Sequence, residues 1–255
     1  EIETVEKYLG HKWGIALAGD SSEPDLTTGL VAHLPFDETT GTVANDASAN
    51  NNHATLSGFD ANQTPWVSGK IGGALAFDGV DDRGVMSGNL SNNFTAAFWL
   101  KTHDSGKSHN VGNWYANTAI LSGPIDTYSL MFRSGFFEFW SGPSPVGRVM
   151  SSGKLNNGSW MHVAATRSVV SDENGSYTIY INGTKDKSAY YDFEASTGAL
   201  LYVGSAFGGT SSTRAKFQGS LDDLRIYDRV LSDTEVKALY DLGFAPAATT
   251  TYANL

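Results

Sequence analysis

The stretch FQGSLDDLRIYDRVLSDTEVKALYD, at residues 217–241, decides the fold of this chain. Its first half predicts a strand, because apolar and charged residues alternate around Leu224 as they do on a half-buried strand. Leu221 is also apolar but lies three residues before Leu224, which breaks the period of two. The break predicts a β-bulge near Asp222 and Asp223, and a bulge can aim two adjacent carboxylates at one point.

The second half of the stretch predicts a turn and a short closing helix. Ser232 offers an N-cap with Glu235 three residues later, which is the spacing of a capping box. Val236, Leu239 and Tyr240 then give the helix one apolar face. We therefore expect the domain to close with a strand and a helix that packs onto it.

The composition excludes several classes of protein. The chain has 255 residues, 40% of them hydrophobic, which allows a sizeable core. It has no cysteine, so disulfide and thiolate chemistry are excluded. The formal net charge of -10 argues against nucleic-acid binding, which needs clustered basic residues. No apolar run reaches membrane-spanning length, so no membrane insertion is expected. Acidic, cysteine-free β-chains are typical of extracellular or cell-surface modules.

Turn signals and short apolar runs divide the chain into three parts. Short runs without long helices predict one β-sandwich domain over residues 29–241. Residues 1–28 are expected to form an N-terminal helix and a linker, and residues 242–255 a C-terminal linker. EIETVEKYLG at residues 1–10 parallels TEVKALYDLG at residues 234–243. The parallel is either chance or a sign that the first part is the tail of a preceding, similar domain.

Several sequence blocks follow the order of a known fold family. They are GLVAHLPFDETTG at 29–41, WVSGKIGGALAFDGVDD at 66–82, FTAAFWLKT at 94–102, SWMHVAATRS at 159–168, YTIYINGTK at 177–185 and LYVGS at 201–205. In the fifth block, Asn182-Gly183 predicts a type I′ hairpin turn. With the closing segment, the blocks resemble the laminin-G-like, or concanavalin A-like lectin-glucanase, jelly-roll domains of bacterial extracellular multidomain proteins. The resemblance implies an all-β fold, an antiparallel two-sheet β-sandwich with short terminal helices. Lectins, adhesion modules and glycan-cleaving enzymes all share this fold, so the function stays open.

The sequence does not predict an enzyme. Glycoside hydrolysis needs two carboxylates close together, and Glu-x-Asp-x-Glu would place them on one face of a strand. No predicted strand has this triplet, and FFEFW at residues 136–140 carries only Glu138. Asp222 and Asp223 are adjacent, so in a regular strand they would face opposite ways.

A structural calcium ion is predicted from a polar loop and two strand ends. Ca²⁺ binds six to eight oxygen atoms, and the loop DASANNNH at residues 46–53 supplies carboxylate, amide and carbonyl oxygens. We expect Asp46 and Asp223 as the first ligands, then Asp37 and Asn51. The alternative is that the loop forms Asx-turns without a metal. Three further aspartates, in FDGVDD, are expected to cap a tight turn rather than bind an ion: Asp78, Asp81 and Asp82.

Sugar binding requires exposed aromatic faces flanked by polar groups. Trp114 and Tyr115 lie in a polar loop without core periodicity, and Trp140 shares a predicted strand face with Glu138. We expect the ligand-binding residues to be Trp114, Tyr115 and Trp140, with Asp126 and Arg133 as polar partners. The alternative is that Trp114 covers a core edge and Trp140 is buried.

The leading interpretation is a non-catalytic, lectin-like carbohydrate-binding module of a secreted or cell-surface protein. Its expected partners are a glycan or polysaccharide and neighbouring domains of the same chain. An adhesion or spacer module in a tandem array, with protein partners, is the second interpretation. A polysaccharide-cleaving enzyme is the third.

Overall fold

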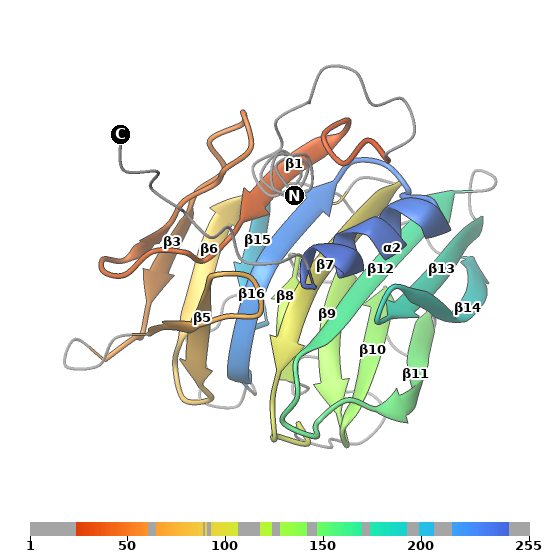
Figure 1. Cartoon of the computed structure of the whole chain (residues 1–255). Coiled ribbons are helices and arrows are strands. Elements are labelled where there is room, and N and C mark those ends of the chain that lie inside the picture. The colour runs from red at the N-terminus through yellow and green to blue at the C-terminus, as the bar shows by residue number, and fades with distance from the viewer. Residues whose placement is uncertain are drawn as a thin grey trace.

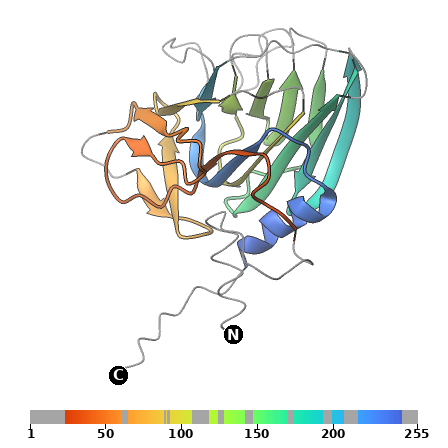
Figure 2. The same cartoon turned by 90° about the horizontal axis from the view of Figure 1, so that it is seen from above.

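The computed structural model describes residues 24–60, 65–88, 90, 93–106, 118–123, 128–141, 147–169, 174–192, 199–206 and 216–244. In this part of the chain, two sheets pack face to face and one short helix lies on the outer side of the first sheet (Figures 1 and 2). The prediction of an all-β, two-sheet sandwich is confirmed. The helix predicted near the N-terminus lies outside the described residues.

Both sheets are antiparallel and have eight strands. The first sheet has the order β14 (Thr184–Asp192), β13 (Asn174–Ile181), β12 (Met161–Val169), β7 (Phe94–Lys101), β16 (Gln218–Tyr227), β5 (Gly73–Asp78) and β4 (Trp66–Ser68), with β1 (Leu30–Leu34) paired to β16. The second sheet has the order β11 (Arg148–Lys154), β10 (Phe136–Ser141), β9 (Tyr128–Arg133), β8 (Thr118–Ser122), β15 (Leu200–Val203), β6 (Arg83–Ser87), β3 (Ala54–Ser57) and β2 (Val43–Ala44).

The main core lies between the two sheets. Phe98 of β7 and Phe137 of β10 meet across it, edge to face, with ring centroids 6.2 Å apart. A second apolar cluster lies on the other side of the first sheet, where Trp99 stacks on Tyr240 of α2 (Asp233–Leu242) with centroids 5.6 Å apart. Each fully buried side chain of this size contributes about 1.5–3 kcal/mol. The first sheet is therefore covered on both faces, by the second sheet and by α2.

The bulge predicted in the closing strand is confirmed. The pairing of β16 with β7 shifts register between Asp222 and Arg225, and Asp223 has a φ of 50°. On its other edge, β16 pairs with β5 up to Leu221 and with β1 from Leu224 onward. The bulge thus lies where the closing strand exchanges one neighbour for another.

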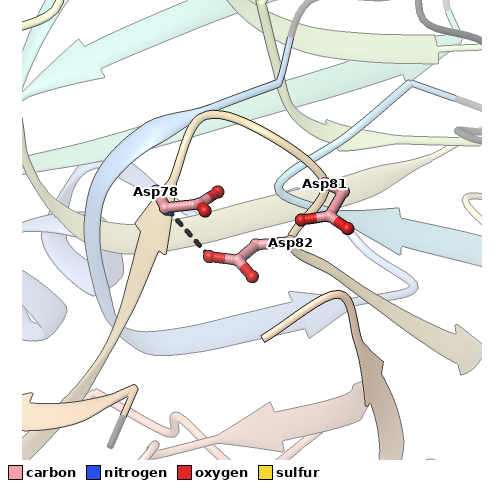
Figure 3. A group of neighbouring side chains, drawn as sticks. All are labelled: Asp78, Asp81 and Asp82. Atoms are coloured by element: carbon pink, nitrogen blue, oxygen red, sulfur yellow. Dashed lines mark hydrogen bonds between the residues drawn. The ribbon is translucent and has the colours of Figure 1, made fainter. Parts of the chain in front are cut away.

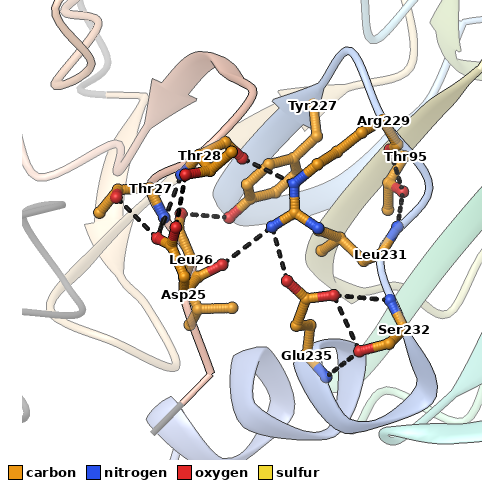
Figure 4. Close-up of polar contacts among 10 residues, drawn as sticks. All are labelled: Asp25, Leu26, Thr27, Thr28, Thr95, Tyr227, Arg229, Leu231, Ser232 and Glu235. Carbon is orange, nitrogen blue, oxygen red and sulfur yellow. Dashed lines mark hydrogen bonds and ion pairs between the residues drawn. The ribbon is translucent and has the colours of Figure 1, made fainter. Parts of the chain in front are cut away.

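The first described residues are hydrogen-bonded to the loop that joins β16 to α2 (Figure 4). Arg229 donates to the backbone oxygens of Asp25 and Thr28 at 2.9 and 2.8 Å, and forms an ion pair of 2.6 Å with Glu235. Glu235 also accepts from the backbone N–H of Ser232 at 2.7 Å, while Ser232 Oγ accepts from Glu235 N at 3.2 Å. The predicted capping box is confirmed.

Packing extends slightly past both ends of the predicted sandwich domain. Leu26 and Leu242 are buried in the cluster beneath α2, although the predicted domain spans residues 29–241. The division into three parts stays a prediction. The predicted hairpin turn is confirmed, because Asn182 and Gly183 join β13 to β14 with φ values of 51° and 73°.

Candidate functional site

The outer face of the second sheet carries part of the predicted ligand-binding set. Phe137 and Phe139 of β10 point into the core, so Phe136, Glu138 and Trp140 lie on the opposite face. The register aligns one row of outer-face residues across five strands: Tyr202, Ser122, Ser129, Trp140 and Arg148. The adjacent row contains Ala119, Met131, Glu138 and Met150.

A buried carboxylate holds two arginines on this outer face. Glu138 Oε1 accepts from Arg133 Nε at 2.9 Å and lies 2.8 Å from Arg133 Nη2 and 3.8 Å from Arg148 Nη1. The Glu138 side chain is 0% exposed, whereas those of Arg133 and Arg148 are 18% and 36% exposed. Burial raises the pKa of Glu138, against the opposing effect of the two guanidinium groups. The carboxylate therefore fixes two cationic donors that reach the surface.

The sequence-predicted ligand residues fall into two groups. Arg133 and Trp140 lie on the outer face, on either side of Glu138 along the β9–β10 hairpin. Trp140 is only 5% exposed, so its ring offers little surface to a ligand. Trp114, Tyr115 and Asp126 lie outside the described residues. Sequence reasoning did not assign roles to Glu138 and Arg148, although the alternation in FFEFW did place Glu138 beside Trp140.

Asp46, predicted as a calcium ligand, organises the polar loop through protein donors. Oδ1 accepts from the backbone N–H groups of His33 and Ser48, both at 2.8 Å. Oδ2 accepts from Ser48 Oγ at 2.7 Å and Asn52 N at 2.8 Å. Burial works to raise the pKa of Asp46, but these hydrogen bonds outweigh it and lower the pKa. Such contacts are those of an Asx-type loop.

Asp223 is paired with a buried arginine and a buried histidine inside the bulge. One of its oxygens lies 2.6 Å from His33 Nε2, and Arg225 donates to both oxygens at 3.1 to 3.3 Å. Burial works to raise the pKa of Asp223, but Arg225 and His33 hold it well below its usual range. Asp37 accepts from Gly73 N at 2.6 Å, and Asn51 is exposed with a φ of 56°. Calcium at these four residues stays a prediction, and an ion at Asp46 or Asp223 would have to displace protein donors.

Three other carboxylates converge in the turn between β5 and β6 (Figure 3). Ligand atoms of Asp78, Asp81 and Asp82 lie within 4.8 Å of one another, and this group could hold a metal ion. Asp82 is 3% exposed, and its Oδ2 accepts from Asp78 N at 2.8 Å. Its Oδ1 is buried without a hydrogen-bond partner. Burial and the charges of Asp78 and Asp81 raise the pKa of Asp82 to about 6.

A pocket of about 310 Å³ adjoins the carboxylate group. Its apolar walls include Phe59, Pro65 and Phe77, and the rings of Phe59 and Phe77 are 5.5 Å apart. Its lining also includes the acidic residues Asp60, Asp78 and Asp82. Sequence reasoning missed this pocket, because β3 and β5 meet there only through the fold.

Comparison with known families gives the class of this protein. The family model of the concanavalin A-like lectin/glucanases superfamily, of laminin G type, matches residues 78–237. That is more than half of the chain, so the chain belongs to this superfamily. No curated protein sequence matches it.

Solved structures agree in fold. Domain 4 of AbnA, a GH43 extracellular arabinanase from Geobacillus stearothermophilus solved with arabinotriose, is 23% identical with a TM-score of 0.60, over 83% of this chain and 98% of that one. The binding domain of Paraclostridial Mosquitocidal Protein 1 is 16% identical with a TM-score of 0.61, over 84% of this chain and 52% of that one. The binding domain of botulinum neurotoxin DC was solved with rat synaptotagmin II and with SialylT. These two structures are 15% and 14% identical, with TM-scores of 0.59 and 0.58, over 84% and 85% of this chain and 52% of each of theirs. Among the described residues, no helix has the length and hydropathy needed to span a membrane.

Proposed function

We propose that this chain is a non-catalytic carbohydrate-binding module of a secreted or cell-surface bacterial protein with several domains. The observation that carries the proposal is the pair of arginines held by Glu138 on the outer face of the second sheet. The AbnA domain solved with arabinotriose and the neurotoxin domain solved with SialylT support a glycan as the ligand.

The outer face suits recognition of sugar hydroxyl or carboxylate groups. Arg133 and Arg148 present several N–H donors in fixed geometry, and Glu138 holds them without being exposed itself. Glu138 is thus a positioning residue, while the arginines are proposed to contact the ligand. Trp114, Tyr115 and Asp126 remain proposed members of the same site, since aromatic stacking would add affinity.

The setting of Glu138 favours binding over hydrolysis. A glycosidase of either stereochemistry needs a second carboxylate about 5 to 9.5 Å away. The cross-strand neighbours of Glu138 are Met131 and Met150, and its same-face neighbours along β10 are Phe136 and Trp140. Among the residues that the structure describes, its charged contacts are two arginines, which stabilise the carboxylate rather than supply a second acid or base.

Glycan binding is tested on an array that includes arabinan and sialylated oligosaccharides, with the whole chain as probe. Replacing Arg133 and Arg148 together by alanine is expected to weaken binding at least tenfold, which is about 1.4 kcal/mol. Trp114→Ala is expected to weaken it as well, without lowering the melting temperature. The control is Lys187→Ala, because Lys187 is exposed on β14 of the other sheet. Undiminished binding by the double variant would remove the outer face from the proposal.

A structural calcium ion belongs to the proposal. Thermal melts of the whole chain with calcium and with a chelator are expected to differ, and equal melts would remove the ion. Asp46→Asn then tests the sequence-predicted ligand set.

The second candidate is an adhesion or spacer module with a protein partner. The neurotoxin binding domain, of which 52% matches this chain, was solved with rat synaptotagmin II, and this supports a protein partner as the alternative. An array without any glycan hit would favour this function.

A further inference from the structure

The outer face of the second sheet is basic, although the chain as a whole has a formal net charge of -10. Four basic residues occupy outward strand positions: Arg83 of β6, Arg133 of β9, and Arg148 and Lys154 of β11. Among the residues that the structure describes, Glu138 is the one acidic residue at an outward strand position of this sheet. Since Glu138 is buried, the charges that reach solvent on these strands are positive.

Strand pairing places Arg83 in the same row as Glu138. Gly84 faces the core and pairs with Val203 of β15, and the register continues through β8 and β9 to Phe139. Arg83 and Glu138 each lie one residue before these positions, on strands that run in the same direction, so both belong to the next row. Three strands lie between β6 and β10 (Figure 1), which at about 4.8 Å per strand separates the two residues by roughly 19 Å.

Arg133 and Arg148 lie close enough to each other to contact one anionic group. Both approach the same oxygen of Glu138, Arg133 Nη2 at 2.8 Å and Arg148 Nη1 at 3.8 Å. The longer distance is that of an ion pair without a hydrogen bond, and within the described part of the chain the Arg148 side chain donates no hydrogen bond. Its N–H groups are therefore available to a ligand carboxylate, which guanidinium groups bind in bidentate geometry.

Two buried polar atoms on the same face lack a hydrogen-bond partner in the described structure. They are Oε2 of Glu138 and Oγ of Ser129, in side chains that are 0% and 2% exposed. Ser129 pairs with Trp140, so it lies in the row next to that of Glu138. Buried polar atoms without a partner are rare in folded proteins unless water or a ligand satisfies them. The hydroxyl groups of a sugar could donate to both atoms, whereas a simple inorganic anion could not.

The spacing of the cations favours an acidic polysaccharide over nucleic acid. Double-stranded DNA has one negative charge per about 1.7 Å of its axis, so most of its phosphates would meet no cation on this face. A uronic-acid polymer has at most one carboxylate per sugar, which suits a close pair of arginines and single cations farther away. At physiological ionic strength charges are screened beyond about 8 Å, so such a polymer would respond to this face rather than to the net charge of the chain.

We propose that this face binds an acidic polysaccharide that runs across the strands, with one uronic-acid carboxylate held by Arg133 and Arg148 and further carboxylates near Arg83 and Lys154. The inference rests on the proposed function, because it names the class of glycan that the same face takes. Glu138 is a positioning residue in this arrangement, since it holds the two guanidinium groups together and is covered itself.

Affinity electrophoresis of the whole chain in polygalacturonate, hyaluronate and alginate tests the class of ligand. Each polymer is compared with its carboxyl-reduced form, which keeps the sugar chain and loses the charge. At least one polymer is expected to bind, and to bind at least tenfold more tightly than its reduced form. Equal binding of the two forms, or binding of neutral glycans such as arabinan alone, would overturn the inference and leave the proposed function standing. A chain that binds no glycan of any kind would overturn both.

Variants of the basic residues test the path of the polymer. The Arg133 and Arg148 double alanine variant is expected to weaken binding of the acidic polymer at least tenfold. Arg83→Ala and Lys154→Ala, at partly or fully exposed positions, are each expected to weaken it about threefold, as single exposed charges do. Lys187→Ala, which removes an exposed charge from the other sheet, is the matched control. Undiminished binding by both single variants would show that the polymer does not run across the strands.

Glu138→Gln separates fixed geometry from net charge. The variant makes the face more positive but no longer holds the two arginines together, so binding of the acidic polymer is expected to weaken. Tighter binding by this variant, or equal binding of wild type to polyglutamate, would reduce the site to net charge and overturn the inference. If Glu138→Gln does not fold, as judged by circular dichroism, the comparison with polyglutamate still decides between the two.

Discussion

Two groups of neighbouring aspartates, in the bulge of β16 and in the turn between β5 and β6, are partnered in opposite ways. Asp223 of the bulge is 5% exposed and contacts Arg225 and His33. Asp82 of the turn is 3% exposed and has no cationic partner in the described structure. Burial opposes ionisation of both, yet the pKa falls for Asp223 and rises for Asp82. A nearby cation, rather than burial alone, decides whether a carboxylate is structural or available to a ligand.

The largest expected effect comes from removing the cation of the bulge. Arg225→Met leaves Asp223 buried without its main partner and is expected to cost about 3 to 5 kcal/mol of unfolding free energy. Urea denaturation measures the loss. Combining Arg225→Met with Asp223→Asn should restore much of the stability, because the uncompensated charge is gone. If Arg225→Met alone lowered the free energy of unfolding by less than about 1 kcal/mol, the cation would not be what stabilises Asp223, and the contrast between the aspartates of the bulge and those of the turn would fail.

The second effect concerns Asp222, which adjoins the paired Asp223. Burial, helped by the charge of Asp223, raises the pKa of Asp222 to about 8. The folded protein then keeps this proton up to about pH 8, whereas the unfolded chain releases it near pH 4. The stabilising contribution is thus complete below pH 4 and is lost as the pH rises toward 8.

Asp222→Asn should remove this loss, because asparagine can still accept from the backbone N–H groups of Lys70 and Ile71. Between pH 5 and 8, the wild type is expected to lose about 3 kcal/mol relative to the variant. Urea denaturation at both pH values measures the difference. Parallel pH profiles would show that Asp222 ionises normally.

The third effect concerns the turn between β5 and β6 and is measured by adding a cation, calcium, to the protein. If calcium binds there, saturation at 100 times the dissociation constant should stabilise the chain by roughly 2 to 3 kcal/mol. Asp82→Asn should abolish this gain, whereas Asp46→Asn should retain it. The opposite pattern in thermal melts would return the ion to the loop predicted from the sequence.

The smallest effect on stability is expected for an ion pair that is exposed to solvent. Lys237 and Asp241 of α2 form an ion pair with side chains 52% and 53% exposed. Lys237→Ala should change the free energy of unfolding by less than about 0.5 kcal/mol, since solvent screens exposed pairs. If Lys237→Ala lowered the free energy of unfolding nearly as much as Arg225→Met, exposure to solvent would not decide how much an ion pair contributes to stability.

Local pattern made much of the fold predictable. The alternation in β16, the capping box at Ser232 and the turn at Asn182 each depend on residues close in sequence, and all three are confirmed. The short strands β2, β3 and β4 were not predicted, because two to four residues give too little periodicity.

The candidate site was less predictable, since its burial comes from distant segments. The sequence pattern at Asp78, Asp81 and Asp82 is that of a turn, and the burial of Asp82 comes from the fold, in which Gly58 packs directly against this turn. The cation that neutralises Asp223 is two residues away in sequence, but its second partner, His33, comes from β1. Which carboxylate is left unpaired is therefore a property of tertiary packing.

The change of neighbour along β16 bears on how the chain folds. Leu30 pairs with Tyr227, almost the whole described chain away, and β16 is also bonded to β5 and β7. Pairings so distant in sequence must overcome a large loop-closure entropy, so folding is expected to be slow for the size of the domain. Neither β1 nor β5 can complete its hydrogen bonds until β16 has been synthesised. During that interval their edges lie open to pairing with other chains, and a chaperone that shields extended segments would then matter most.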